Sequence, residues 1–129
     1  MSTRSLINVE CVDGTVKSVY CHFDGSDHLE TLQGFYNSQE KAEALVSLGD
    51  ISVLDDLMDC PEGHSFDTPV KGYCVFYHRD RGEDWEDTEP QEFRNLKSAR
   101  RQDRGQEFIY EWTENQWRGY DIGRKRYIK

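Results

Sequence analysis

The sequence predicts a single α+β domain over residues 1–129, with a β-hairpin near each end of the chain and helices between them. Three observations predict this class. Apolar and polar residues alternate around a turn near the start, they alternate again near the end, and the segments between show helical spacing. We therefore expect an antiparallel sheet, built from the two hairpins and a middle strand and packed by two to three helices.

The first hairpin is predicted over residues 5–23. Alternating runs flank Asp13-Gly14, a dipeptide that accepts the positive φ angles of a tight turn. Ile7, Val9 and Cys11 would then share one face. The second hairpin is predicted over residues 107–122, around Glu114-Asn115. Its aromatic residues lie mostly at even spacing and are best explained by core packing, although a stacking platform for bases is a minor alternative.

Two helices are expected after the first hairpin. Leu29, Leu32 and Phe35 follow possible N-caps at Ser26 and Asp27. In the second helix, Ser38 is the expected N-cap and Gly49 is placed to end the helix. The predictions for the middle of the chain are a helical turn within residues 51–58, a loop over 59–72, a strand over 73–78, a surface loop over 79–92 and a short helix over 91–101.

The charge of the chain is strongly negative, at −9, and unevenly distributed. Residues 1–60 contain 11 Asp and Glu but only three Lys and Arg. Such a surface repels phosphates, which argues against tight nonspecific DNA binding, and it suits a basic protein partner. No secretory signal and no apolar run of about 18 residues occurs, so we expect no membrane span and four reduced cysteines in a cytosolic protein.

An acidic cluster surrounds Trp85 and is a candidate partner-binding surface. An aromatic side chain among acids could dock on a basic protein groove, whereas a solvated acidic loop is the simpler interpretation. The candidate partner-binding residues are Glu83, Asp84, Trp85, Glu86, Asp87 and Glu89, together with Asp55 and Asp56.

Two His/Asp groups form a candidate ligand site. His22 and Asp24 are two residues apart and would share a strand face, so Asp24 could orient the imidazole as a general base. The alternative, which turn chemistry favours, is that Asp24-Gly25 only shapes the exit of the strand. If two strand ends lie side by side, one cleft would be lined by His22, Asp24, His78, Arg79, Asp80 and Arg81.

The spacing Cys-x3-His occurs twice, at Cys60/His64 and at Cys74/His78. Thiolate and imidazole are ligands of zinc, but this spacing is uncommon and the second pair would be spread along a strand. We therefore expect buried thiols and ordinary histidines, with no metal and no other cofactor. Basic residues also recur at helical intervals, at Arg94, Lys97, Arg101 and Arg104, and cluster at Arg124, Lys125, Arg126 and Lys129. They could contact phosphates or neutralise the chain's own acids.

Several motifs resemble those of a family of small uncharacterised proteins encoded by tailed bacteriophages. The opening MSTRSLI, the strand end Tyr20–Gly25 (YCHFDG), the helix end Leu48–Ser52 (LGDIS) and the segment Arg79–Glu83 (RDRGE) carry the resemblance. After Asp24-Gly25 the family more often continues with Tyr and a longer Gly-containing loop, so a pocket shaped by that loop would be altered here. The resemblance implies a phage protein acting in the cytoplasm of its bacterial host, and small phage proteins of this kind often bind host machinery or host defences.

Together these observations favour a binding protein over an enzyme. The leading hypothesis is a phage protein that binds and inhibits a host bacterial protein, such as a component of an antiviral defence system, through its acidic surface. The alternative is a protein that binds a small molecule, such as a nucleotide or another small anion, or a small hydrolase, using the His/Asp/Arg residues of the strand ends.

Overall fold

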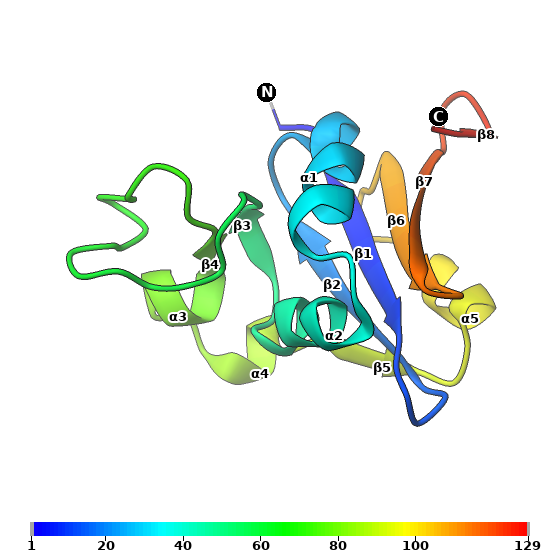
Figure 1. Cartoon of the computed structure of the whole chain (residues 1–129), viewed down its shortest axis with the longest axis horizontal. Helices are drawn as coiled ribbons and strands as arrows, with labels where there is room; N and C mark the ends of the chain where they lie inside the picture. The colour runs from blue at the N-terminus through cyan, green and yellow to red at the C-terminus, as the bar shows by residue number, and fades with distance from the viewer. Residues whose placement is uncertain (1, 129) are drawn as a thin grey trace.

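The structure is a computed structural model that describes residues 2–128. A mixed eight-stranded sheet runs through the molecule, and α1 and α2 pack on one of its faces (Figure 1). The strands are β1 (Ser5–Glu10), β2 (Val16–Cys21), β3 (Ile51–Val53), β4 (Val75–Phe76), β5 (Gln91–Phe93), β6 (Phe108–Thr113), β7 (Gln116–Asp121) and β8 (Arg126–Tyr127). The helices are the 3-10 helix η1 (Gly25–Asp27) and α1 (His28–Phe35), α2 (Gln39–Ser47), α3 (Tyr77–Arg81), α4 (Trp85–Thr88) and α5 (Leu96–Arg100). Within residues 2–128, no helix has the length and apolar character needed to cross a membrane.

The α+β class is confirmed, but the sheet is mixed rather than wholly antiparallel. Its strand order is β4-β3-β2-β1-β6-β7-β8, and β5 pairs with the first half of β2. The pairs β1–β6 and β2–β3 are parallel. Parallel neighbours need a long crossover connection. The segment with α1 and α2 connects β2 to β3, and the chain from β2 to α5 lies between β1 and β6.

Both predicted hairpins are confirmed. β1 pairs antiparallel with β2, and β6 pairs antiparallel with β7. Glu114 and Asn115 have φ angles of 53° and 60°, as a two-residue turn between twisted strands requires. In the first hairpin, the Cys11 amide donates to the Thr15 carbonyl at 2.8 Å, and Gly14 adopts a φ of 89°.

The main core lies between the sheet and helices α1 and α2. Ile7 and Val19, which face each other across β1 and β2, are fully buried with Leu32 of α1 and Leu45 of α2. The predicted N-cap of α2 is confirmed, because Ser38 Oγ accepts a hydrogen bond from the Lys41 amide at 3.1 Å. This packing holds the helices against one face and leaves the ends of the sheet for other elements.

Four local predictions in the middle of the chain are wrong. The predicted surface loop over 79–92 contains the end of α3, all of α4 and the start of β5. Residues 51–53 form β3 instead of a helical turn, because Ile51 is buried between Cys21 and Phe76 in the sheet. The predicted strand over 73–78 is only β4, and α3 begins directly after it. There the Asp80 carboxylate accepts the Phe76 amide at 2.8 Å, and Gly82 ends the helix with a φ of 82°.

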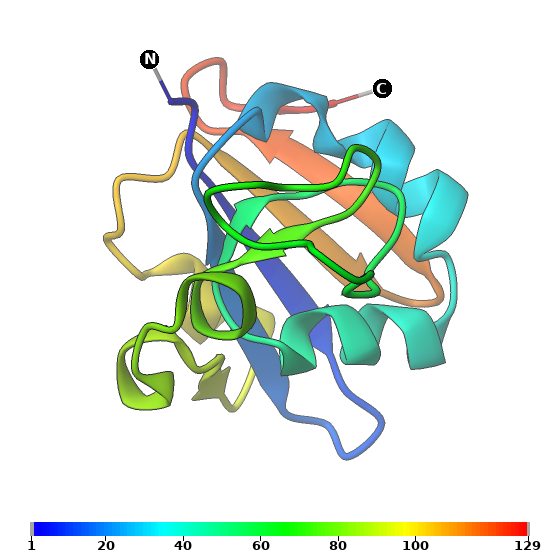
Figure 2. The same cartoon turned by 90° about the vertical axis from the view of Figure 1, so that its left-hand side faces the viewer.

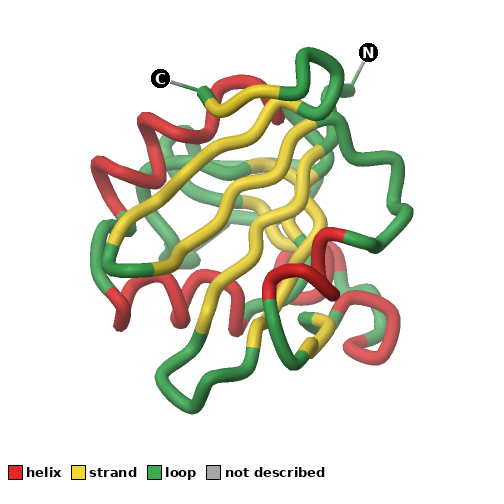
Figure 3. The backbone as a smooth tube through the Cα atoms, turned by 90° about the vertical axis from the view of Figure 1, so that its right-hand side faces the viewer, coloured by secondary structure: helices red, strands yellow, loops and turns green. Residues whose placement is uncertain are grey.

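The predicted helix over 91–101 divides into β5 and the shorter α5. The Asn95 side chain accepts the Ser98 amide at 2.9 Å and therefore sets the start of α5 after β5. Arg94 and Arg104 thus lie outside the helix, and the predicted single basic stripe is not formed. α5 and the segment that follows it cover part of the sheet face opposite α1 and α2, since Gln102 donates to Ser18 Oγ at 2.8 Å (Figure 3).

Candidate functional site

The connection between β3 and β4 is a long loop at one end of the molecule (Figure 2). Residues 54–74 contain no helix or strand, and their one isolated bridge joins Leu57 to Tyr73. Loops of this length in a compact domain are usually functional or disordered. The loop over residues 54–74 is held in place by a network of hydrogen bonds, and this network is the first feature of the site.

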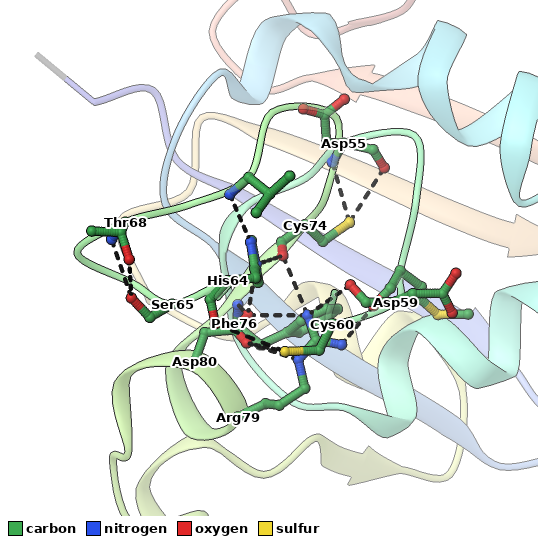
Figure 4. A network of polar contacts seen from close by, with 12 residues as sticks. Asp55, Asp59, Cys60, His64, Ser65, Thr68, Cys74, Phe76, Arg79 and Asp80 are labelled. Atoms are coloured by element: carbon green, nitrogen blue, oxygen red, sulfur yellow. Dashed lines mark hydrogen bonds and ion pairs between the residues drawn. The ribbon is translucent and has the colours of Figure 1, made fainter. Parts of the chain in front are cut away.

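Asp80 is the centre of the network that holds the loop (Figure 4). Its buried carboxylate accepts hydrogen bonds from Arg79 Nε at 2.9 Å, from Arg79 Nη2 at 3.1 Å and from the Phe76 amide at 2.8 Å. Burial alone would raise the pKa of Asp80, but these hydrogen bonds and the nearby charge of Arg79 outweigh it and lower the pKa below its usual value. Asp80 is therefore a structural anion at neutral pH.

Arg79 and His64 join the loop to this carboxylate, and His64 Nε2 lies 3.5 Å from Asp80 Oδ2. The Arg79 guanidinium also donates to the carbonyls of Met58, Asp59 and Cys74, which lie at both ends of the loop. His64 Nδ1 accepts the Val70 amide at 2.9 Å, so the proton is on Nε2, which donates to the Cys74 carbonyl at 2.9 Å. Both histidine nitrogens are thus occupied by the loop's own backbone.

The four residues of the two Cys-x3-His pairs do not converge. Cys74 is fully buried, and its Sγ lies 3.3 Å from Tyr36 Oη, whereas Cys60 is exposed. His78 Nδ1 is 2.7 Å from the Glu83 carbonyl oxygen, and the His78 ring packs edge-on against Trp85. Within residues 2–128, no three His, Cys, Asp or Glu side chains are grouped to hold a metal ion. Burial raises the pKa of the Cys74 thiol.

The acidic cluster around Trp85 forms α4 and its flanks. The Thr88 carbonyl accepts the Asp50 amide at 2.8 Å. A Cβ on Gly49 would overlap the Thr88 carbonyl oxygen and press on the Trp85 ring, and the φ of Gly49, 85°, also disfavours any other residue. Trp85 is nevertheless 39% exposed. α4 is therefore fixed to the turn between α2 and β3, with its aromatic ring at the surface.

The acids of this cluster differ in how they are engaged. Asp84, Glu86 and Asp87 are exposed, and Glu83 and Glu89 are partly exposed. Among residues 2–128, Glu83 pairs with Arg81 at 3.4 Å, and none of the other four forms an ion pair. Asp55 and Asp56 are half-buried at the start of the loop, where the Asp55 carbonyl accepts from Tyr36 Oη at 2.7 Å.

We call residues 54–90, which contain the loop, α3 and α4, the acidic lobe. This segment contains 11 Asp and Glu against three Lys and Arg, out of 25 acids and 16 bases in the chain. Figure 1 places the loop and α3 at one end of the molecule, away from β6 to β8. The fold thus collects negative charge at one end. The excess of acids in residues 1–60 of the sequence indicates this only in part, because most of the lobe lies after residue 60.

The strand end at His22 lies near a second polar group. His22 Nδ1 is 2.7 Å from Tyr20 Oη, and burial together with the charge of Arg4 lowers the pKa of His22. Asp24 adopts a left-handed conformation, with φ of 58°, at the start of η1, and the Gly25 amide donates to the Thr3 carbonyl at 2.8 Å. The imidazole therefore has a tyrosine as its hydrogen-bonding partner.

Sequence reasoning did not predict the contacts of three residues beside this strand end. Arg104 makes a two-point ion pair with the buried Asp50, at 2.8 and 3.4 Å, and its guanidinium lies 5.2 Å from the centre of the Tyr20 ring. Asp50 Oδ1 also accepts the Tyr20 amide at 2.9 Å. His28 is buried with its Nε2 3.3 Å from Cys21 Sγ, and burial lowers its pKa to about 4. No local motif marks these long-range pairs.

The six candidate ligand residues do not form the predicted cleft with a paired histidine and aspartate, and most of them have other partners. Arg79 and Asp80 hold the loop, His78 packs on Trp85, and the Arg81 guanidinium lies 4.7 Å from the centre of the Phe66 ring. The His22 imidazole forms a hydrogen bond with the Tyr20 hydroxyl instead. Comparison of the chain with protein-family models, with curated proteins and with solved structures finds no match.

Proposed function

We propose that this chain is a phage-encoded protein that binds and inhibits a basic host protein through the acidic lobe, in the cytoplasm of the infected bacterium. The proposed host factor is a component of an antiviral defence system. The resemblance of the YCHFDG, LGDIS and RDRGE segments to tailed-phage proteins supports the biological setting. The charge of the lobe supports the mode of action.

The observation that carries this proposal is the concentration of unpaired acids on a fixed surface. Asp84, Glu86 and Asp87 are exposed and form no ion pair within residues 2–128. Clustered charge of one sign steers an oppositely charged partner and raises the association rate. Because the rest of the chain has nearly equal numbers of acids and bases, a basic partner is drawn to this end of the molecule.

Two exposed apolar side chains in the lobe supply contact area. Trp85 is 39% exposed and Leu57 is 43% exposed. Aromatic residues surrounded by a charged rim are typical of the few positions that dominate binding energy in protein interfaces. In this proposal the acids set orientation and speed, and Trp85 contributes most of the affinity.

The network around Asp80 adds rigidity to the proposed surface. Arg79 joins both ends of the loop to α3. Binding by a surface that is already ordered loses less conformational entropy than binding by a mobile loop. The buried ion pair thus has a role in the proposed function although it is not at the surface.

A capture experiment with matched charge reversals tests the proposal. The tagged protein is incubated with bacterial lysate beside the triple variant Asp84→Lys/Glu86→Lys/Asp87→Lys. The control is Glu92→Lys/Asp103→Lys/Glu107→Lys, which makes the same change in net charge at three exposed acids outside the lobe. We expect a saturable partner that the wild type and the control retain and the lobe variant loses. Equal capture by all three proteins, or no saturable partner, would contradict the proposal.

A further inference from the structure

A group of surface hollows lies around one aromatic residue at the opposite end from the acidic lobe. Three hollows of about 780, 700 and 340 Å³ open there, and Tyr127 lines each of them. Their walls come from η1, α1, α5 and the strands β6 to β8. The sequence motifs include Arg124 and Arg126 as part of a basic cluster, but they do not indicate these hollows.

The C-terminal segment, which supplies most of these walls, has more basic than acidic residues, unlike the acidic lobe. Residues 91–129 contain ten Lys and Arg against six Asp and Glu. Each hollow is lined by at least one arginine and at least one acid: the arginines are Arg100, Arg118, Arg124 and Arg126, and the acids are Asp27, Glu30, Glu111 and Asp121. The C-terminal segment is therefore net positive, although the net charge of the chain is −9.

The largest hollow combines aromatic and cationic walls, and we call it the Tyr127 pocket. It is lined by Phe108, Tyr127 and Ile128 on the apolar side and by Arg124, Arg126 and Ser26 on the polar side. Asp121 also lines it, but its carboxylate accepts the Arg124 amide at 3.1 Å and lies 3.8 Å from Arg124 Nε. Arg126 forms no ion pair within residues 2–128 and is free for a ligand.

Tyr127 is held in position while its ring stays accessible. It pairs with Tyr120 across β7 and β8, and the two rings meet edge to face with their centres 5.1 Å apart. The following amide, of Ile128, donates to the Gly119 carbonyl at 2.8 Å. Tyr127 remains 53% exposed. A fixed, exposed tyrosine face is suited to stacking on a planar ring with little further loss of entropy.

We propose that the Tyr127 pocket binds a nucleotide, with the base on the apolar side against Tyr127 and the phosphate between Arg124 and Arg126. A guanidinium matches the geometry of a phosphate, and the volume of about 780 Å³ lies in the range of small-ligand pockets. The neighbouring hollow carries Asp27 and Glu30 on its α1 side, which repel a phosphate and fix the ligand's orientation. The same chemistry is offered by a free nucleotide and by one unit of a short single strand.

Binding measurements with defined probes distinguish these sources. Adenosine monophosphate, inorganic phosphate and single-stranded hexathymidylate are titrated into the full chain and followed by calorimetry. We expect adenosine monophosphate to bind more tightly than inorganic phosphate, because the base adds stacking. Tighter binding of hexathymidylate than of the mononucleotide would identify a single strand as the ligand, and the reverse order would identify the free nucleotide.

Two pocket variants and one control test the location of the site. Tyr127→Ala and Arg126→Glu are each expected to weaken nucleotide binding about tenfold, through lost stacking and reversed charge respectively. Lys97→Glu makes the same charge change on an exposed position of α5 and is expected to alter binding less than about twofold. Tyr127→Leu replaces Tyr127→Ala if the alanine variant fails to fold. Absence of nucleotide and oligonucleotide binding at millimolar concentration, or equal binding by all variants, would overturn the proposal.

Discussion

Replacement of Asp80 by alanine tests whether the ion-pair network holds the acidic lobe. The side chain is fully buried, and the substitution removes the acceptor of four hydrogen bonds, two from Arg79, one from the Phe76 amide and a longer one from the Cys60 thiol. Arg79 then loses its counter-ion but keeps its bonds to loop carbonyls. We expect the loop and α3 to loosen while the core between the sheet and α2 stays folded.

The expected loss of stability is about 3 kcal/mol. Removing one partner of a buried ion pair costs about 3–5 kcal/mol. The lower end applies here because the Arg79 side chain is 22% exposed and water reaches it once the carboxylate is gone. With a slope of about 1.5 kcal/mol per molar urea, the unfolding midpoint falls by about 2 M. Domains of this size are stable by about 5–15 kcal/mol, so the variant remains folded in buffer.

Urea unfolding followed by tryptophan fluorescence measures this change, and amide hydrogen exchange of residues 57–74 locates it. The matched control is Asp67→Ala, an exposed acid of the same loop, for which we expect less than about 0.5 kcal/mol. Because the pKa of Asp80 is lowered in the folded protein, its contribution is present above the unfolded pKa of about 3.9 and is lost as the pH falls through the folded value. A loss below about 1 kcal/mol at neutral pH, with unchanged exchange in the loop, would refute this role of the network.

Three further substitutions have definite expectations. Gly49→Ala should destabilise by about 3 kcal/mol, because its φ is 85° and a Cβ would overlap the Thr88 carbonyl oxygen; unchanged urea unfolding would show that α4 shifts freely. In the wild type, the free energy of unfolding should fall by about 3 kcal/mol as the pH falls from about 6.5 to 4, because His28 binds a proton in the unfolded chain but stays neutral in the folded protein, where its pKa is about 4. The variant His28→Gln should lack this contribution to the pH dependence, and an equal pH dependence in both proteins would contradict it. Arg104→Ala should cost about 2–3 kcal/mol by leaving the buried Asp50 unpaired, and a double-mutant cycle with Asp50→Asn that gives no coupling would exclude that pair.

The elements predicted correctly are those whose signals are local. The turn at Glu114-Asn115, the N-cap at Ser38 and the helix end at Gly49 each depend on the conformations that these residues prefer. β3 was missed because Ile51 is placed by pairing with strands far along the chain. α3 was missed because Asp80 removes the Phe76 amide from the strand ladder.

The candidate site divides in the same way. The acids around Trp85 are contiguous, so composition alone identified them, and their exposure is consistent with the proposed surface. The ion pair of Asp50 with Arg104 and the hollows around Tyr127 join residues that are distant in sequence. Composition identified Arg104, Arg124 and Arg126 only as members of basic clusters and did not predict these arrangements. The Cys-x3-His spacing is misleading for a physical reason: His64 serves the backbone of the loop and His78 packs on Trp85.

The most direct test of the central claim is the association rate constant between this protein and its purified host partner, measured at about 50 mM and about 300 mM salt. The proposed role of the acidic lobe predicts a rate that falls about tenfold or more over this range. It also predicts that Asp84→Lys/Glu86→Lys/Asp87→Lys slows association at low salt far more than Glu92→Lys/Asp103→Lys/Glu107→Lys does. A rate that is independent of salt, or equally affected by the two triple variants, would contradict docking through the acidic lobe.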